Sequence, residues 1–292
     1  MLTLPDRLTI DRLDPFLEEL GAVVASGPAG KLPIEFGPLA FIDPAGTAAL
    51  ATAMDYLRSR GFVPEVRHQP HRAPVAAYLR DVRLFDLLAD PETTDLVPGR
   101  QTAFPLSRVT HGQSFDLLKN SFAPWLSGIL SISPASLEQL RACLGELFNN
   151  IADHADVATG FFFAQHFPNA QRVGIALADF GIGIPARVRL RIPGLDDGAA
   201  LAKAFEEGFS TRTTPRNRGA GLDWLKRYVV DVNGGKVDVH SHRGRLLASP
   251  GPGGAVFQAR CARGQFPGVL YYIDLRTEAI RPTEDTREDL EW

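Results

Sequence analysis

One amphipathic segment, residues 136–154, constrains the fold of this chain more than any other. Its apolar residues recur at the spacing of one face of an α-helix. Glu146, Asn150 and His154 are four residues apart and share the opposite face. The predicted helix therefore packs one side on a core and presents polar groups on the other, although such a polar face is also typical of a solvated helix. The apolar residues are Leu137, Leu140, Leu144, Leu147, Phe148 and Ile151.

A second feature follows the apolar segment 173–178, which is predicted to be a strand. Asp179 stands at its end, and Gly181 and Gly183 come next at alternate positions. A carboxylate at the end of a buried strand must meet water or accept hydrogen bonds. The glycines allow a ligand to approach the backbone. This pattern suits a hydrogen-bond donor such as the adenine amino group better than it suits phosphate.

A dinucleotide-binding fingerprint is the rival interpretation, because residues 181–186 fit the pattern G-x-G-x-x-A. Three observations argue against it. Asp179 would repel a pyrophosphate, Pro185 and Pro193 crowd the expected helix, and no clean second strand carries the acidic residue expected about 20 positions further on.

A third feature is the glycine pair Gly219 and Gly221, which is predicted to open a helix that begins at Leu222. The free N–H groups and the positive dipole of a helix N-terminus favour an anion such as phosphate. Residues 208–214 before it are rich in hydroxyl groups and lie between basic residues. They suit a lid over phosphates, and a plain surface loop is the alternative.

In this order and with these gaps, the three features resemble the N, G1 and G2 boxes of the GHKL superfamily. That superfamily includes gyrase B, heat-shock chaperone ATPases, mismatch-repair ATPases, histidine kinases and anti-sigma-factor serine kinases. The resemblance extends over about residues 125–262, and residues 146–155 are most similar to the anti-sigma kinase version. It implies an α/β fold in which a Bergerat-type α/β sandwich binds ATP and Mg²⁺.

The resemblance also implies roles for individual residues. Asn150 would coordinate Mg²⁺, Asp179 would accept a hydrogen bond from adenine, and Glu146 would be the general base of phosphoryl transfer. His154 would contact phosphate or make a structural hydrogen bond. The other nucleotide-binding residues implied are Gly181, Gly183, Thr211, Arg218, Gly219, Gly221 and Leu222.

The N-terminal part has its own resemblance. Its pattern predicts strands at 33–42 and 62–68 and helices at 47–60 and 75–88, with Asp43 capping the first helix. Residues 39–50 look like the signature of STAS domains, the anti-sigma-factor antagonist fold. That family carries a phosphorylated serine or threonine where this chain has Ala45. We therefore expect a docking or regulatory module that selects a protein partner.

Composition bounds the remaining expectations. The chain has 292 residues, a net charge of −3 and 45% hydrophobic residues, so nucleic acid is not expected as a partner. No apolar run approaches the roughly 20 residues of a membrane span, and Cys143 and Cys261 look like reduced core residues, so we expect a cytoplasmic protein without a membrane partner. The expected organisation is a STAS-like domain at 1–95, a connector at 96–125, a GHKL ATP-binding domain at 126–265, and a C-terminal strand and acidic tail at 266–292.

The leading functional hypothesis is a signalling protein that hydrolyses ATP or phosphorylates a partner protein. A non-hydrolysing, ATP-gated interaction switch is the alternative, and the resemblance implies homodimerisation as an option. A histidine kinase ranks third, because His111 lies in the predicted connector. The pairs His68/His71 and His240/His242 each lack a third metal ligand at suitable spacing, so they are expected to be solvent-facing histidines.

Overall fold

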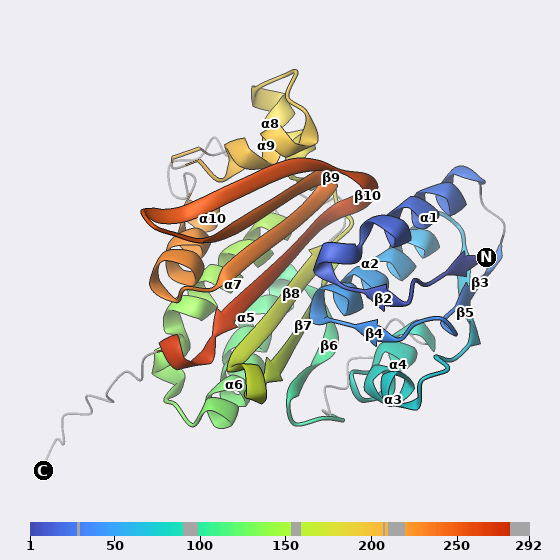
Figure 1. Cartoon of the computed structure of the whole chain (residues 1–292), viewed down its shortest axis with the longest axis horizontal. Helices are drawn as coiled ribbons and strands as arrows, with labels where there is room; N and C mark the ends of the chain where they lie inside the picture. Colours follow the sequence, from blue (N-terminus) through green and yellow to red (C-terminus); the bar gives the residue numbers. More distant parts are fainter. Residues whose placement is uncertain (28–29, 90–98, 153–158, 207, 210–219, 281–292) are drawn as a thin grey trace, which may run out of the picture.

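The structure is a computed structural model that describes residues 1–27, 30–89, 99–152, 159–206, 208–209 and 220–280. Figure 1 shows two α/β parts side by side. The N-terminal part, coloured blue to cyan, packs against one face of a larger sheet formed by the C-terminal part. The predicted α/β fold class is therefore confirmed.

The N-terminal part contains a small parallel sheet in the order β1-β3-β5, built from Leu2–Thr3, Lys31–Glu35 and Val63–His68. A second parallel pair joins β2 (Arg7–Leu8) to β4 (Phe41–Ile42). The predicted strand at 33–42 is thus two strands in two sheets. The chain turns between them, where the Glu35 carboxylate accepts a hydrogen bond from the Gly37 N–H at 2.8 Å.

Helix α2, Pro44–Ser59, begins as the sequence predicts. The Asp43 side chain caps it by accepting a hydrogen bond from the Gly46 N–H at 2.7 Å, and Pro44 occupies the first turn. The other helices of this part are α1 (Asp14–Ala25), α3 (Ala73–Asp81) and α4 (Leu84–Ala89), with a short 3₁₀ helix η1 at Ile10–Arg12.

The single helix predicted at 75–88 is divided into α3 and α4. Arg83 lies between them in the left-handed region, with φ 68°, which ends one helix and redirects the next. Because of this bend, Leu79, Val82, Leu84 and Leu87 are all buried in the same core. Tertiary packing has overridden a continuous helical period.

The larger sheet is antiparallel throughout and has the order β6-β7-β8-β10-β9. Strand β8 extends the predicted segment by one residue at each end, while β7 was not expected from the sequence. The C-terminal strand expected after residue 265 is part of one long strand, β10, which begins at Gly254. The strands are β6 (Ala103–Thr110), β7 (Thr159–Phe167), β8 (Arg172–Asp179), β9 (Lys236–Gly251) and β10 (Gly254–Arg276).

Residues 96–125 are not the plain connector that their prolines and glycines suggested. They contain β6, which is the edge strand of the large sheet, and the helices that follow it. Pro105 falls at an irregularity in the pairing of β6 with β7, and an edge strand tolerates proline there. Pro124 lies just after the junction of the π-helical segment with α6, inside one continuous helical run. The helical segments are α5 (His111–Asp116), the π-helical η2 (Leu117–Phe122) and α6 (Ala123–Leu130).

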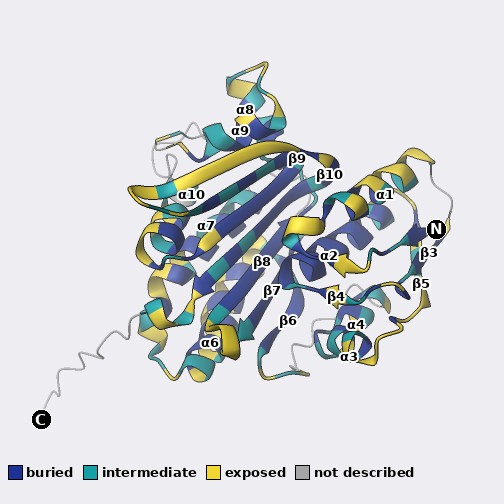
Figure 2. Ribbon diagram, in the orientation of Figure 1, coloured by how far each residue is buried: buried dark blue, intermediate teal, exposed yellow. Residues whose placement is uncertain are grey.

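Side chains of the large sheet alternate between two buried faces, as the period of a β-strand requires. Phe161, Phe163, Ala176, Ala178 and Leu270 join the core of the N-terminal part. Phe162, Ile175, Leu177, Tyr271 and Ile273 join a second core with the helices on the other face. Figure 2 shows β6, β7 and β8 as buried along most of their length, while residues 254–261 of β10 are mostly exposed.

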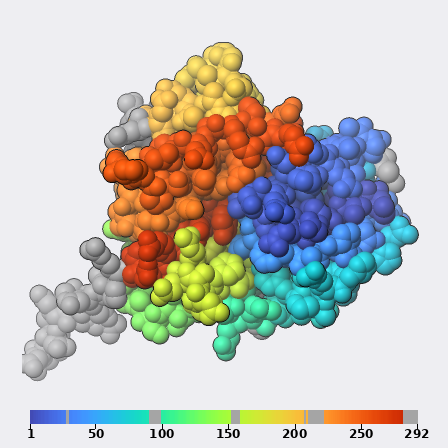
Figure 3. Space-filling model, in the orientation of Figure 1, coloured from blue at the N-terminus to red at the C-terminus, as the bar shows by residue number. Residues whose placement is uncertain are grey.

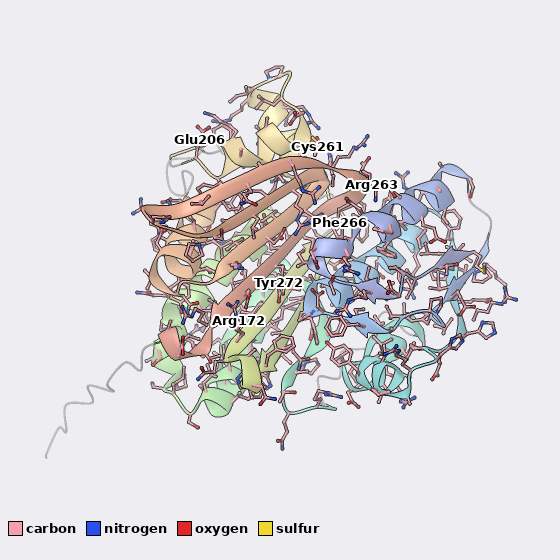
Figure 4. All side chains as sticks on the ribbon, in the orientation of Figure 1. Arg172, Glu206, Cys261, Arg263, Phe266 and Tyr272 are labelled. Carbon is pink, nitrogen blue, oxygen red and sulfur yellow. The ribbon has the colours of Figure 1, made fainter. Side chains whose placement is uncertain are left out.

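The N-terminal part is therefore joined to the sheet by a continuous apolar core. Helix α2 contributes Ala45, Ala48 and Ala49, each 0% exposed, and such small side chains let a helix lie close to a sheet. Helix α1 packs on β10, where a Cβ at Gly264 would lie 2.4 Å from the Leu17 Cβ. Figure 3 shows the blue N-terminal atoms in contact with the orange and red strands, and Figure 4 places Phe266 and Tyr272 along β10 beside the N-terminal helices.

The remaining helices flank the second core or lie at the end of the sheet. Helix α8 forms despite the two prolines, because Pro185 falls in its first turn and the helix ends before Pro193. These helices are α7 (Glu138–Ala152), α8 (Gly183–Arg191), α9 (Asp197–Ala204) and α10 (Ala220–Leu225), which continues as the π-helical η6 (Lys226–Val232). Short 3₁₀ segments lie at Pro134–Leu137, Pro168–Ala170 and Thr277–Ala279, and the predicted acidic tail at 281–292 lies outside the described residues.

Candidate functional site

Helix α7 has the two-sided character that its sequence predicts. Every member of its apolar stripe is at most 4% exposed, whereas Glu146 and Asn150 are only partly buried. The Glu146 carboxylate accepts a hydrogen bond from the Asn149 side-chain amide at 3.3 Å. His154 lies outside the described residues. The helix thus holds a carboxylate and an amide on the face that points away from the core.

Asp179 occupies the last position of β8 and is 4% exposed. One carboxyl oxygen accepts a hydrogen bond from the Gly181 N–H at 2.7 Å. Burial raises the pKa of this carboxyl from 3.8 to about 7, and the Gly181 N–H opposes that rise. A buried carboxyl with one backbone partner is a favourable acceptor for a ligand that brings its own N–H group.

The glycine loop after Asp179 is held tightly against β9 and β10. Gly183 adopts φ 74°, and a Cβ there would lie 2.7 Å from His242 Nε2 and 2.8 Å from Ser241 Oγ. Only glycine tolerates both this backbone conformation and this contact. The loop therefore needs its second glycine for packing as well as for any approach of a ligand.

Ser241 connects this loop to the neighbouring strands. Its hydroxyl accepts a hydrogen bond from the Ile184 N–H at 2.9 Å and donates one to the Gly268 carbonyl at 2.7 Å. Gly268 in turn approaches the start of the loop, because a Cβ there would lie 2.3 Å from the Asp179 carbonyl oxygen. The glycine loop is thus held in place by β9 and β10, two strands that come much later in the sequence.

Ser241 and Gly268 were not identified from the sequence. Gly268 offered one signal, since a glycine inside a strand often marks a close approach of another backbone. Ser241 offered none, because its role depends on the pairing of β9 with β10 at a bulge.

The last turn of α7 packs against the start of β7, which lies beside the end of β8. A Cβ at Gly160, at the start of β7, would lie 3.2 Å from Ile151 Cδ1 and 2.9 Å from the Ala178 carbonyl oxygen. Ile151 directly follows Asn150, and Ala178 directly precedes Asp179. The structure therefore brings the polar end of the helix next to the strand end that carries the buried carboxyl.

The third predicted feature is described only in part. Thr211, Arg218 and Gly219 lie outside the described residues, while Gly221 and Leu222 belong to α10. Helix α10 packs against α7, where the Cys143 thiol donates a hydrogen bond to the Trp224 carbonyl at 3.7 Å. The predicted start of this helix at the glycine box falls at the edge of the described residues. The features on α7 and α10 are thus neighbours in space.

Some expectations about isolated residues were wrong. His240 is 2% exposed, and burial lowers its pKa to about 3, so it is a core histidine that stays neutral. Cys261 is exposed, although Cys143 is buried as expected. His68, by contrast, is exposed as expected, and its Nδ1 lies within hydrogen-bond distance of Glu35 Oε2, at 2.5 Å. Among the described residues, no group of three histidine, cysteine or acidic side chains is suited to hold a metal ion.

Comparison with known families agrees with this geometry. Residues 135–263 match the family described as histidine kinase-, DNA gyrase B-, and HSP90-like ATPase. The C-terminal part of the chain therefore contains a GHKL-type ATPase domain, and the match includes α7, the Asp179 loop and α10.

The match leaves the N-terminal part uncovered, so the STAS-like character of residues 1–95 stays a prediction. No curated protein matches the chain. Among the helices of the described residues, none is long and apolar enough to cross a membrane.

Proposed function

We propose that this chain is a signalling protein that binds Mg-ATP and hydrolyses it or transfers its phosphoryl group to a partner protein. The observation that carries the proposal is the nearly inaccessible carboxyl of Asp179, which lies at a strand end beside a glycine loop within the ATPase-family region. An adenine amino group would give that carboxyl the second hydrogen-bond donor that its burial favours.

Two residues of α7, Asn150 and Glu146, suit the phosphate end of the nucleotide. The Asn150 amide oxygen is a ligand type that Mg²⁺ accepts, and Mg²⁺ would neutralise charge on the phosphates. Glu146 lies one helical turn before Asn150 on the same partly exposed face. Its carboxylate would accept the proton of an attacking water or protein hydroxyl as the oxygen bonds to the γ-phosphorus and ADP leaves.

Nucleotide binding and turnover test this proposal separately. We expect isothermal titration calorimetry to detect binding of a nonhydrolysable ATP analogue that weakens when EDTA removes Mg²⁺. Purified wild-type protein should also release phosphate from ATP, or label a partner protein. Absence of binding would overturn the whole proposal.

A non-hydrolysing ATP-gated switch is the second candidate. It is favoured by the extensive core that joins the nucleotide-side sheet to the N-terminal part, because such a core offers a path from bound nucleotide to a regulatory surface. Binding without any turnover, in the presence of Mg²⁺, would select this candidate over the enzyme.

The N-terminal part is proposed as the partner-selecting module in either case. Ala45, at the position where STAS domains carry a phosphoacceptor, is 0% exposed. The helix that carries it packs on the chain's own sheet, so a protein partner would meet other faces of this part. Homodimerisation and a cytoplasmic location belong to the same proposal, and sedimentation velocity with and without nucleotide tests the former.

A further inference from the structure

Phe180 connects the proposed adenine site to the N-terminal part. It stands between Asp179 and Gly181, the two residues joined by the hydrogen bond that shapes the turn. Its ring lies 6.1 Å from the ring of Tyr56, centroid to centroid, with the planes inclined at 56°. This distance and tilt are within the range of favourable aromatic pairs. The turn is therefore in contact with α2 as well as with the large sheet.

Tyr56 is well supported on its own side. The Arg60 guanidinium lies 5.3 Å from the centre of the Tyr56 ring, and its Nη2 donates a hydrogen bond to the Tyr56 hydroxyl at 3.2 Å. The preceding residue, Asp55, accepts hydrogen bonds at 2.9 Å from Arg58 on the same helix and from Arg108 on β6. The end of α2 that presents Tyr56 is thus anchored to the sheet independently of the aromatic contact.

The opposite side of the turn is held by Gly268 of β10 and by Ser241 of β9. Gly268 packs against the backbone of residues 179–181, and Ser241 fixes the first turn of α8. The Asp179 turn is consequently held between two supports. Ser241 lies within the family match, whereas Gly268 lies just beyond its last residue, 263, and Tyr56 lies in the N-terminal part that the match does not cover.

We propose that Tyr56 is a positioning residue for the nucleotide site, and that the N-terminal part controls nucleotide affinity through its contact with Phe180. This inference rests on the proposed function for its ligand. The Tyr56 ring holds Phe180, and Phe180 holds the turn in which Asp179 receives the Gly181 N–H. Loss of the ring leaves that turn supported on one side only, so the carboxyl is less well aimed and better hydrated.

The same contact works in both directions, because coupling between two sites is reciprocal. Nucleotide that orders the Asp179 turn strengthens the contact with α2. A partner that displaces the C-terminal end of α2 weakens nucleotide binding. The N-terminal part then regulates the site without contributing a group that touches the nucleotide.

Calorimetric titration of Tyr56→Ala and Tyr56→Phe with a nonhydrolysable ATP analogue and Mg²⁺ tests the inference. Tyr56→Ala should weaken binding by about three- to tenfold, as expected for an aromatic pair. Tyr56→Phe keeps the ring and should bind within about twofold of wild type. Phe85→Ala is the matched control, because Phe85 pairs with Phe36 at 5.5 Å elsewhere in the N-terminal part. That control should leave nucleotide affinity unchanged.

A second readout does not depend on nucleotide. In Tyr56→Ala, the pKa of Asp179, followed by carbon-13 NMR, should fall from about 7 toward 3.8 as water reaches the turn. It should stay near the wild-type value in Phe85→Ala. If Tyr56→Ala does not fold, Phe180→Leu supplies the same two measurements from the other side of the contact.

The outcomes separate the two proposals. Wild-type affinity together with an unshifted Asp179 pKa in Tyr56→Ala overturns the inference and leaves the nucleotide site standing. A wild-type protein that binds no nucleotide, but whose Asp179 pKa falls in Tyr56→Ala, overturns the proposed function and keeps the positioning role.

Discussion

The carboxyl group of Asp179 accepts a hydrogen bond from the Gly181 N–H at 2.7 Å while the residue is only 4% exposed. Its pKa is raised from 3.8 to about 7 by burial. An acid whose folded-state pKa is raised contributes stability that is fully present below its unfolded pKa and is lost as the pH rises through its folded pKa. Above about pH 7 the ionised carboxylate therefore destabilises the free protein.

Asp179→Asn should accordingly stabilise the protein and impair the site. The amide oxygen can still accept from Gly181, so the melting temperature should rise at about pH 8 and the gain should shrink below about pH 5. Nucleotide affinity should fall by about tenfold or more, because an uncharged amide is a weaker acceptor for the adenine amine. Differential scanning fluorimetry and calorimetric titration measure the two effects. A lower melting temperature at about pH 8 would contradict this account of Asp179.

Glu146→Ala should separate turnover from binding. If Glu146 is the general base, ATP turnover should fall by about a hundredfold or more while nucleotide affinity stays within about twofold. Glu138→Ala on the same helix is the control, since Glu138 is exposed and paired with Arg141. Phosphate release measured for both variants checks the prediction, and equal activity of Glu146→Ala and wild type would remove the catalytic role.

Gly268→Ala should disable the site from a strand that lies outside the three sequence boxes. A Cβ there would lie 2.3 Å from the Asp179 carbonyl oxygen and 2.7 Å from the Gly181 nitrogen, so the turn must move. We expect nucleotide affinity to fall by about tenfold or more and the protein to lose stability. Gly128→Ala, where nothing lies within 4 Å of the new Cβ, should change neither affinity nor fold.

The ion pair between Asp55 and Arg108 should stabilise the contact between the two parts of the chain. Asp55 has a side-chain exposure of 5%, and Arg108 reaches it from β6 at 2.9 Å. Arg108→Ala should lower the free energy of unfolding by about 1.5–3 kcal/mol, the value of a hydrogen bond to a charged group. Arg263→Ala breaks the more exposed pair with Glu18 and should cost less than about 1 kcal/mol. Urea denaturation of both variants gives the comparison.

Several elements could be predicted from the local sequence alone. The apolar stripe of α7, the Asp43 cap of α2 and the apolar strand that ends at Asp179 all follow from side chains within one or two turns or one strand. Periodicity and capping act over that range, so they could be recognised without a structure. The nucleotide-site prediction depended on these same elements.

Elements that depend on distant partners were missed or misjudged. The edge strand β6 contains a proline and is stabilised by pairing with β7. Strand β7 was also not predicted from the sequence. His240 was expected in solvent, yet it is 2% exposed and lies against the backbone of Ile10 in the N-terminal part. In each case the deciding partner lies far away in the sequence, and no local pattern reports it.

The sequence by itself determined which side chains the site would offer, because a carboxyl at a strand end, alternate glycines and a polar helix face are local patterns. Only the tertiary structure decided how those groups are held. The Asp179 turn is fixed by Ser241 and Gly268 from two later strands and by Tyr56 through Phe180. These supports arise from sheet pairing and from the packing of the N-terminal part, which bring together residues that no short-range pattern connects.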